Sequence, residues 1–503
     1  MNRLPVLTLL VLSFFAAGAA SGDRDRGELD RHLEIRIQVD DRSQLLELGT
    51  IVAIENYRDG EVWAATTAAQ RREIADAGFR WYLAPQRAKD GEITMCPDGW
   101  ENDAQRSWDC YPSYGQYTAL MARYASIYPE LCRLVDLGPT TNTDRPHRLW
   151  AVVISDNPGL EEDEPEVLLT STMHGDETTG FVLLLRLIGH LAEGYGDDSA
   201  ITRLIDETEI WINPNANPDG TYFGGDDDVA EAIRYYTTNM GGNSFVDPNR
   251  NFPDPGLDAA DPETDCVPEC FAETKAMLAL AETSAFVLSV NVHGGFEVIN
   301  YPWDGVRRRH PDDDWLQAIS RSWADLAQDD SPPGYLTELE NGITHGWDWY
   351  KTNGSRQDFM TFYQGGREVT AELSHSKLLP ADELDDHWQW NRRAMLDFIG
   401  QSLEGIRGVV TDRDGQPLAA VVEVIGRDTE EDGSVVRTDP DVGDYHRLLL
   451  PGLYDLRISA PRYWTSEIPG IAVTEGAATV VDVTLQPKLQ TRRATRRNVP
   501  IDP

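Results

Sequence analysis

A histidine and a glutamate three residues apart form the pattern in this chain with the clearest chemistry. They are His174 and Glu177 of the tetrad His174-Gly175-Asp176-Glu177, which follows the apolar run 166–170. At such a change from a strand pattern to a helical one, an imidazole and a carboxylate can point to one position. They are two of the three protein ligands that a catalytic zinc ion takes. Because His-x-x-Glu is common by chance, other residues must support this interpretation.

Two further residues at the ends of apolar segments could complete such a site. His293 ends the predicted strand 285–292 and is followed by two glycines that turn the chain and leave room for a metal. It could instead simply cap a buried strand. Glu372 ends another apolar strand, where a carboxylate costs several kcal/mol unless it has a partner or a task. We interpret Glu372 as the base that takes a proton from the attacking water, with a structural salt bridge as the alternative.

The segment 246–253, Val-Asp-Pro-Asn-Arg-Asn-Phe-Pro, is rich in side chains that bind carboxylates. Arg250 can hold a carboxylate through two parallel hydrogen bonds, and Asn249 adds another donor. Asp247 could accept the second ring N–H of a metal-binding histidine and so fix its tautomer. Taken alone, the segment could also be an ordinary polar loop.

The elements that would position these residues fall into three regions. A small α/β module has predicted strands at 33–39, 50–55, 62–66 and 79–83 and helices at 42–48 and 67–77. A linker open to proteolysis is expected at 84–95. The central region alternates strands (149–154, 166–172, 209–214, 285–291, 367–373) with helices (113–128, 180–193, 273–283, 312–328, 381–405). This alternation predicts an α/β layer fold with a mixed sheet, whose active residues lie at strand ends.

From residue 405 the pattern changes to short β-like runs separated by turn residues. The runs are 406–411, 420–425, 435–438, 444–450, 452–459 and 479–485, and they predict a small β-sandwich. The basic tail 488–503 is expected to be disordered.

The net charge and the N-terminal sequence limit the functions that this protein can have. The formal net charge is −41, from 85 acidic and 44 basic residues, which disfavours nucleic acid and anionic membranes as partners. This charge could draw in basic peptides, or it could reflect only a well-solvated surface. Residues 1–20 carry Arg3, an apolar stretch and small residues, the pattern of a cleavable secretory signal. We therefore expect a soluble protein that is secreted or periplasmic and has no membrane span.

Export makes disulfides possible for the five cysteines. Proximity suggests Cys96 with Cys110 and Cys266 with Cys270, although the sequence leaves the pairing open. Cys132 would then remain as a buried thiol in a helical pattern.

Together these motifs resemble the zinc metallocarboxypeptidase family over residues 111–401. The resemblance implies one zinc ion held by His174, Glu177 and His293, and a three-layer mixed-sheet fold. It makes Glu372 the general base. It implies that Asn249 and Arg250 bind the terminal carboxylate and that Asp247 supports His174. It also implies that Tyr350 closes over substrate and that Arg234 polarises the scissile carbonyl. The family-like stretch 213–220 is interpreted as structural.

Within this family the chain is similar to the regulatory N/E-like branch. The motifs that carry this similarity are His293-Gly294-Gly295, Asn300-Tyr301-Pro302-Trp303-Asp304, Gly342-Ile343-Thr344 and residues 367–374. The β-rich region resembles the transthyretin-like domain of that branch, whereas the N-terminal module resembles propiece-type modules found elsewhere in the family. The resemblance implies that Asp304 and Gln357 line the pocket for the departing side chain, near the basic Arg356. A carboxylate there predicts removal of C-terminal Lys or Arg.

The sequence thus predicts a signal peptide (1–20), a propiece-like α/β module (21–92), a zinc carboxypeptidase domain (93–402), a transthyretin-like β-sandwich (403–487) and a disordered basic tail (488–503). The predicted function is zinc-dependent removal of single residues from peptide or protein C-termini. One alternative is a non-catalytic peptide-binding or adhesion protein on the same fold. Another is a carboxypeptidase or amidase for apolar or cell-wall peptide ends. The oligomeric state stays open.

Overall fold

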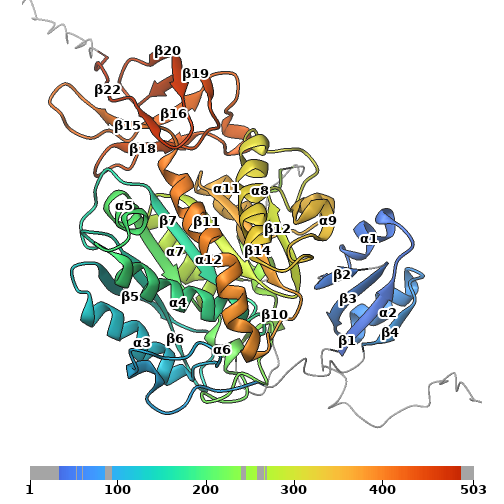
Figure 1. The fold of residues 1–503 in the computed structure, drawn as a ribbon. Coiled ribbons are helices and arrows are strands. Elements are labelled where there is room, and N and C mark those ends of the chain that lie inside the picture. The colour runs from blue at the N-terminus through green and yellow to red at the C-terminus, as the bar shows by residue number, and fades with distance from the viewer. Residues whose placement is uncertain are drawn as a thin grey trace, which may run out of the picture.

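The computed structural model describes residues 33–52, 54–58, 60–84, 93–238, 245–257, 265–266 and 269–488. These residues form three regions, each built around its own β-structure (Figure 1). The segment 1–20 and the tail beyond residue 488, for which the sequence predicts a signal peptide and disorder, lie outside the described residues. So does most of the predicted linker.

The central region has, in its described part, an eight-stranded mixed sheet in the order β13-β12-β14-β11-β7-β8-β6-β5. The strands are β5 (Cys132–Pro139), β6 (Arg148–Ile154), β7 (Glu166–Ser171), β8 (Glu209–Asn213), β11 (Phe286–His293), β12 (Phe296–Tyr301), β13 (Ile343–His345) and β14 (Arg367–Ser374). β8, β7, β11 and β14 run parallel to one another. Their carboxyl ends therefore meet at one edge of the sheet.

Helices cover both faces of this sheet (Figure 1). Side chains alternate between the two faces along each strand, so each face presents apolar residues to its helices. Val152, Ile154 and Leu169 point into the larger core. The helices α3 (Tyr114–Ile127), α4 (Thr179–Gly194), α5 (Ser199–Glu207), α8 (Asp313–Asp330) and α12 (Leu384–Gly400) complete that core. Val153 and Leu168 point to the other face, where they pack on α7 (Ala272–Thr283) and α11 (Arg356–Tyr363). The predicted three-layer mixed-sheet fold is confirmed.

Short elements complete the central region. They are α6 (Pro218–Thr221), α9 (Glu338–Asn341), α10 (Gly346–Trp349), the strand pair β9 (Tyr236–Thr237) and β10 (Phe245–Val246), and the 3-10 helices η1 (Trp100–Asn102), η2 (Pro248–Arg250), η3 (Ala381–Glu383) and η4 (Gln401–Leu403).

The N-terminal module is a four-stranded antiparallel sheet in the order β2-β3-β1-β4. Its elements are β1 (Leu33–Gln38), α1 (Arg42–Leu48), β2 (Asn56–Arg58), β3 (Glu61–Thr66), α2 (Ala68–Asp76) and β4 (Trp81–Leu83). The strand predicted at 50–55 is wrong. Backbone bonds from Ile51 and Val52 to Leu48 continue the end of α1 as a turn. Glu55 therefore lies just before β2, outside any strand.

The C-terminal region has two four-stranded sheets in its described part, ordered β18-β15-β21 with β22 beside β15, and β17-β16-β19-β20. The elements are β15 (Gly405–Thr411), β16 (Val421–Val424), η5 (Glu430–Asp432), β17 (Val436–Arg437), β18 (Asp444–Arg447), β19 (Gly452–Ser459), β20 (Ser466–Val473), β21 (Ala478–Val480) and β22 (Val483–Thr484). The sequence did not predict β20, which contains Pro469 and Gly470. An edge strand tolerates these residues because its outer backbone groups need no partner.

The central region shows further differences from the sequence prediction. Cys132 starts β5 and is not helical, because α3 already ends at Ile127, before Pro129. The sequence also left out β12, β13, α5 and α11. Disulfides join Cys96 to Cys110 and Cys266 to Cys270, and Cys132 is a buried free thiol, so the suggested pairing is confirmed. Within the described residues, no helix combines the length and apolar character that a membrane span needs.

Candidate metal centre and substrate pocket

The parallel strands β7 and β11 bring the tetrad and His293 together. His174 follows the end of β7, Glu177 lies just before α4, and His293 is the last residue of β11. β7 and β11 are hydrogen-bonded neighbours, so both segments leave the sheet at the same edge. The Glu177 amide donates to the carbonyl of His174, 3.0 Å away, which closes the turn between the two side chains.

The tetrad is held against the stretch 213–220 and leaves no room for a side chain at Gly175. A Cβ atom there would lie 2.4 Å from the carbonyl carbon of Gly220. The Asn217 amide also donates to the carbonyl of Met173 at 3.1 Å. The turn therefore fixes the backbone on both sides of His174, which gives the stretch a structural task.

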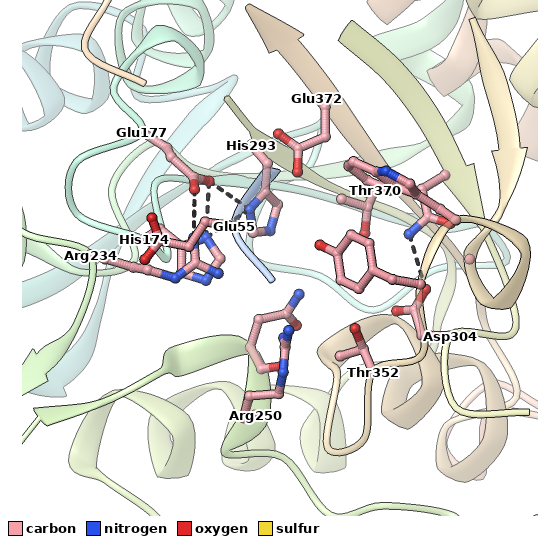
Figure 2. Close-up of a pocket in the computed structure, with 15 residues that line it drawn as sticks. Glu55, His174, Glu177, Arg234, Arg250, His293, Asp304, Thr352, Thr370 and Glu372 are labelled. Atoms are coloured by element: carbon pink, nitrogen blue, oxygen red, sulfur yellow. Dashed lines mark hydrogen bonds and ion pairs between the residues drawn. The ribbon is translucent and has the colours of Figure 1, made fainter. Parts of the chain in front are cut away.

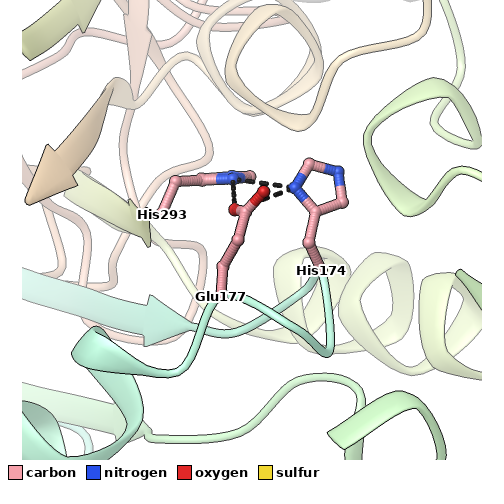
Figure 3. Close-up of side chains that lie close together, drawn as sticks. All are labelled: His174, Glu177 and His293. Carbon is pink, nitrogen blue, oxygen red and sulfur yellow. Dashed lines mark hydrogen bonds and ion pairs between the residues drawn. The ribbon is translucent and has the colours of Figure 1, made fainter. Parts of the chain in front are cut away.

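Three ligand atoms converge at the sheet edge (Figure 3). Glu177 Oε2 lies 2.7 Å from His293 Nδ1 and 3.0 Å from His174 Nδ1, and the two Nδ1 atoms are 3.1 Å apart. All three side chains are at most 3% exposed. Burial lowers the pKa of His293 to about 4, so its ring is neutral at pH 7. Two imidazoles and one carboxylate that converge in this way form a ligand set that fits zinc.

The remaining ring nitrogens of the two histidines are held by amide and carboxylate groups. His174 Nε2 lies 3.0 Å from Asp247 Oδ1, and His293 Nε2 lies 2.8 Å from the side-chain amide of Asn291. Such contacts turn each Nδ1 toward the centre of the cluster.

Arg234 is buried beside the cluster and bridges two carboxylates. Its Nη1 donates to Glu177 Oε1 at 2.9 Å and its Nε to Asp247 Oδ2 at 3.0 Å. The resemblance gives Arg234 the task of polarising a carbonyl. The structure adds that two of its nitrogens fix the orientation of Glu177 and Asp247.

Glu372 lies opposite His293 in the register of β14 and β11. It is 9% exposed, and its Oε2 is buried with no hydrogen-bond partner among the described residues. Burial, followed by the nearby charge of Glu177, raises its pKa well above the ordinary 4.5. Within that part of the chain it forms no ion pair, so the alternative of a structural salt bridge finds no partner.

A pocket opens beside this cluster, and Figure 2 shows the metal-binding side chains, Glu372, Arg250 and Asp304 around one common space. Its lining residues are Glu55, His174, Glu177, Arg234, Asn249, Arg250, His293, Asn300, Asp304, Gly346, Trp349, Tyr350, Thr352, Thr370 and Glu372. Asn249 Oδ1 accepts a hydrogen bond from the Arg356 amide at 3.0 Å, which leaves its NH₂ group for the pocket. The Arg250 guanidinium donates to the carbonyl of Asn249 at 2.8 Å.

Asp304 supplies a buried carboxylate to the pocket wall. Its Oδ1 accepts from Asn300 Nδ2 and Gln357 Nε2, both at 3.0 Å, and burial raises its pKa. Gly346 lies against it so closely that a Cβ would be 2.0 Å from this oxygen. Gln357 therefore does not line the pocket as expected but supports Asp304 from behind. Arg356 is buried and binds Glu368 Oε2 at 3.0 Å, which neutralises its charge.

With this geometry in place, comparison with known proteins decides the family. Residues 117–394, more than half of the 503, match the zinc carboxypeptidase family model. The chain belongs to the zinc carboxypeptidase family. Residues 405–486 match the carboxypeptidase regulatory-like domain. The β-rich region therefore belongs with that of the regulatory branch.

Curated relatives and solved structures show which members of the family this chain resembles. Carboxypeptidase D of Anas platyrhynchos is 36% identical over 358 residues, 68% of this chain and 24% of that protein. The chain thus spans about a quarter of the first relatives it matches. The human carboxypeptidase N catalytic chain is 33% identical over 389 residues, 70% of this chain and 80% of that one. Carboxypeptidase A from Helicoverpa armigera shares the fold, with a TM-score of 0.57 at 16% identity over 74% of this chain and 98% of that one.

Among the pocket residues that the sequence missed, Glu55 comes from the N-terminal module. Its Oε2 lies 2.7 Å from Lys377 Nζ, which is also 3.5 Å from Asp176 Oδ2 of the tetrad. Burial alone would raise the pKa of Glu55, but Lys377 and Arg234 hold it below its ordinary value. Tyr350 on the pocket wall packs against the core of the same module. No local pattern around Glu55 signals this contact.

Proposed function

We propose that this protein is an exported, zinc-dependent carboxypeptidase that removes single Lys or Arg residues from the C-termini of peptides or proteins. One observation carries the proposal. Glu372, a buried carboxylate with an unpartnered oxygen, lies in register with His293 of a three-ligand cluster, and both face a pocket lined by Asn249 and Arg250.

The metal site would hold one zinc ion through His174, Glu177 and His293. A bound zinc ion supplies Lewis acidity that activates water and polarises a carbonyl. Asp247 contacts His174 and Arg234 contacts Glu177, so these two residues orient two of the ligands, and Asn291 holds the ring of His293.

Glu372 supports acid–base chemistry at the same place. A carboxylate whose pKa is raised takes a proton from water more readily than an ordinary glutamate. The protonated Glu372 then donates this proton to the amine that leaves when the peptide bond breaks. One residue thus acts as base in the first step and as acid in the second.

Arg250 and Asn249 support cleavage of the last peptide bond only. A guanidinium binds the terminal carboxylate of a peptide through two parallel hydrogen bonds, and an amide NH₂ adds a third. Tyr350, on the same wall, can add a hydroxyl donor. A peptide without a free carboxylate in this position leaves the half-buried Arg250 without an anionic partner, which disfavours internal cleavage.

Asp304 supports selection of basic side chains. Its carboxylate is buried on the pocket wall, and Arg356, which adjoins the Asp304-binding Gln357, is already paired with Glu368. A Lys or Arg side chain would therefore be the cation that satisfies Asp304. Export rests on the signal-like pattern of residues 1–20.

The decisive experiment replaces Glu372 with Gln and measures release of arginine from a peptide ending in Arg, together with bound zinc. The expected result is a loss of about 10²–10⁴-fold in kcat with zinc retained. Normal turnover by this variant would refute the mechanism. A parent protein that holds no zinc and hydrolyses no peptide would instead indicate a binding protein.

A second variant, Asp304→Ala, tests the specificity. It should reduce release of Lys and Arg and leave release of apolar residues unchanged, because only a cation uses the Asp304 carboxylate. A mixed-terminus peptide pool gives both rates in one assay. Equal loss for all residues, or a parent that prefers apolar ends, contradicts the proposed preference.

A further inference from the structure

A second cluster of metal-ligand side chains lies where the β-sandwich meets the central region. Asp444 and His446 are two residues apart on β18, so they share one face of the strand. Tyr445, on the other face, packs in the sandwich core. Asp163 joins the cluster from the segment between β6 and β7. One ligand atom from each of Asp163, Asp444 and His446 lies within 4.8 Å of the other two.

The cluster contains buried oxygen atoms that no described residue satisfies. The Asp444 side chain is 6% exposed, and its Oδ1 has no hydrogen-bond partner in the described part of the chain, although its Oδ2 lies 2.9 Å from His446 Nε2. The Oδ1 of Asp163 is buried and unpartnered in the same way. A buried polar group without a partner costs about 1–3 kcal/mol, so native proteins fill such positions with water or an ion.

The charges around the cluster favour a cation. Glu161 interacts electrostatically with Asp439, Asp441 and Asp444, which adds negative potential. One cation is close, because Arg407 Nη1 lies 3.8 Å from Asp163 Oδ2, but this contact uses the other oxygen of Asp163. The two unpartnered Oδ1 atoms thus remain available to a small ion.

We propose that Asp163, Asp444 and His446 form a second site, for a divalent transition metal such as zinc, that joins the β-sandwich to the central region. One imidazole and two carboxylates suit zinc, whereas calcium takes oxygen ligands. The Asp163 side chain is 40% exposed, which gives the ion an entry path.

This site is separate from the pocket. Asp163 precedes β7 and the tetrad follows it, and a strand of six residues spans about 20 Å. The ion would therefore act on stability, because it links β18 to a segment of another region. It has no part in peptide hydrolysis and does not depend on the proposed function.

The test counts zinc in the full chain. The protein is stripped with EDTA, refilled with zinc, separated from free metal by gel filtration and assayed by elemental analysis. The parent should retain two zinc ions per chain, and His446→Gln should retain one. Asp441→Asn, which removes a neighbouring charge but no ligand, should retain two. A His446→Gln variant that retains as many zinc ions as the parent overturns the proposal, whatever the count in the parent.

A second measurement covers the case in which His446→Gln does not fold. Asp163→Asn changes a partly exposed side chain and should leave folding intact, yet it should also lose the second zinc ion. Zinc should raise the thermal unfolding midpoint of the parent by more than that of Asp163→Asn, because only the parent binds the ion that links the two regions. Equal zinc counts and equal shifts for the two proteins contradict the site.

Discussion

The N-terminal module and the β-sandwich contact the central region at different places and through different kinds of interaction. The N-terminal module touches the wall of the substrate pocket, whereas the β-sandwich is held by charged residues that are absent from the pocket lining. In Figure 1 the two regions lie on different sides of the central sheet. We therefore expect a substrate to compete with the first contact and to leave the second unchanged.

The β-sandwich is anchored on Asp312, a fully buried carboxylate just before α8. It accepts hydrogen bonds from Arg367 Nε at 2.8 Å, Arg427 Nε at 2.6 Å and Arg447 Nη2 at 2.7 Å. Arg447 also binds Asp428 Oδ1 at 2.6 Å. Burial alone would raise the pKa of Asp312, but Arg447 and Arg367 hold it well below its ordinary value. This network makes the sandwich a permanent part of the fold.

The N-terminal module reaches the pocket through one ion pair and one aromatic contact. Glu55 pairs with Lys377, and Tyr350 packs on the module core. Because Glu55 and Tyr350 both line the pocket, a docked module restricts the space for a peptide end. The difference between the two contacts teaches that this module is positioned to regulate access, and the sandwich to stabilise the fold.

The largest effect should come from Asp312→Ala. The substitution leaves three arginines facing one another without their shared anion, which costs about 3–5 kcal/mol of unfolding free energy. Urea unfolding measures this loss. The matched control is Asp314→Ala, because Asp314 pairs with Arg427 but its side chain is 55% exposed. It should cost at most about 1 kcal/mol. Equal losses in the two variants would show that the Asp312 network is not the anchor.

The next effect concerns Glu55→Gln. Removing this charge weakens docking of the module by about 1–2 kcal/mol, so kcat/KM for a peptide ending in Arg should rise about 5–30-fold. Initial rates of the full chain measure the change.

A control within the same module is Glu61→Gln, whose partner is Arg36 on the neighbouring strand. It removes an equal charge away from the pocket and should leave kcat/KM unchanged. If Glu55→Gln behaves like Glu61→Gln, the module does not compete with substrate.

Local patterns were sufficient to predict that His174, Glu177, His293 and Glu372 lie at one edge of the sheet. Each stands at or near the end of an apolar strand, and parallel strands bring such ends to one edge, so spacing and strand pattern carry the information. The layer fold followed from the alternation of strands and helices. The strand β20 could not be predicted from its local pattern, because Pro469 and Gly470 are strand breakers that only an edge position tolerates.

Contacts between regions could not be predicted in this way. Glu55 and Lys377 are 322 residues apart, and their pairing depends on how a separate module docks. Asp312, Arg427 and Arg447 are charged residues of a kind usually found on surfaces, and only the packing of two regions makes them a buried network. The resemblance predicts Gln357 on the pocket wall from its position in the sequence. Its side chain instead points to Asp304, a contact that sequence position does not reveal.

The smallest effect is the pH dependence of the two contacts. The pKa of Glu55 in the docked state is lowered from the ordinary 4.5, so docking is favoured above pH 4.5 and loses this contribution as pH falls through the lowered pKa. The contribution of Asp312 is also lost as pH falls. Because its pKa lies well below the ordinary 3.8, the sandwich keeps its anchor to lower pH. On acidification from pH 6, hydrogen exchange, corrected for its intrinsic pH dependence, should therefore increase first in residues 33–84 and later in 405–488. In Glu55→Gln the early step should disappear, and simultaneous loss of protection in both regions would contradict the difference between the two contacts.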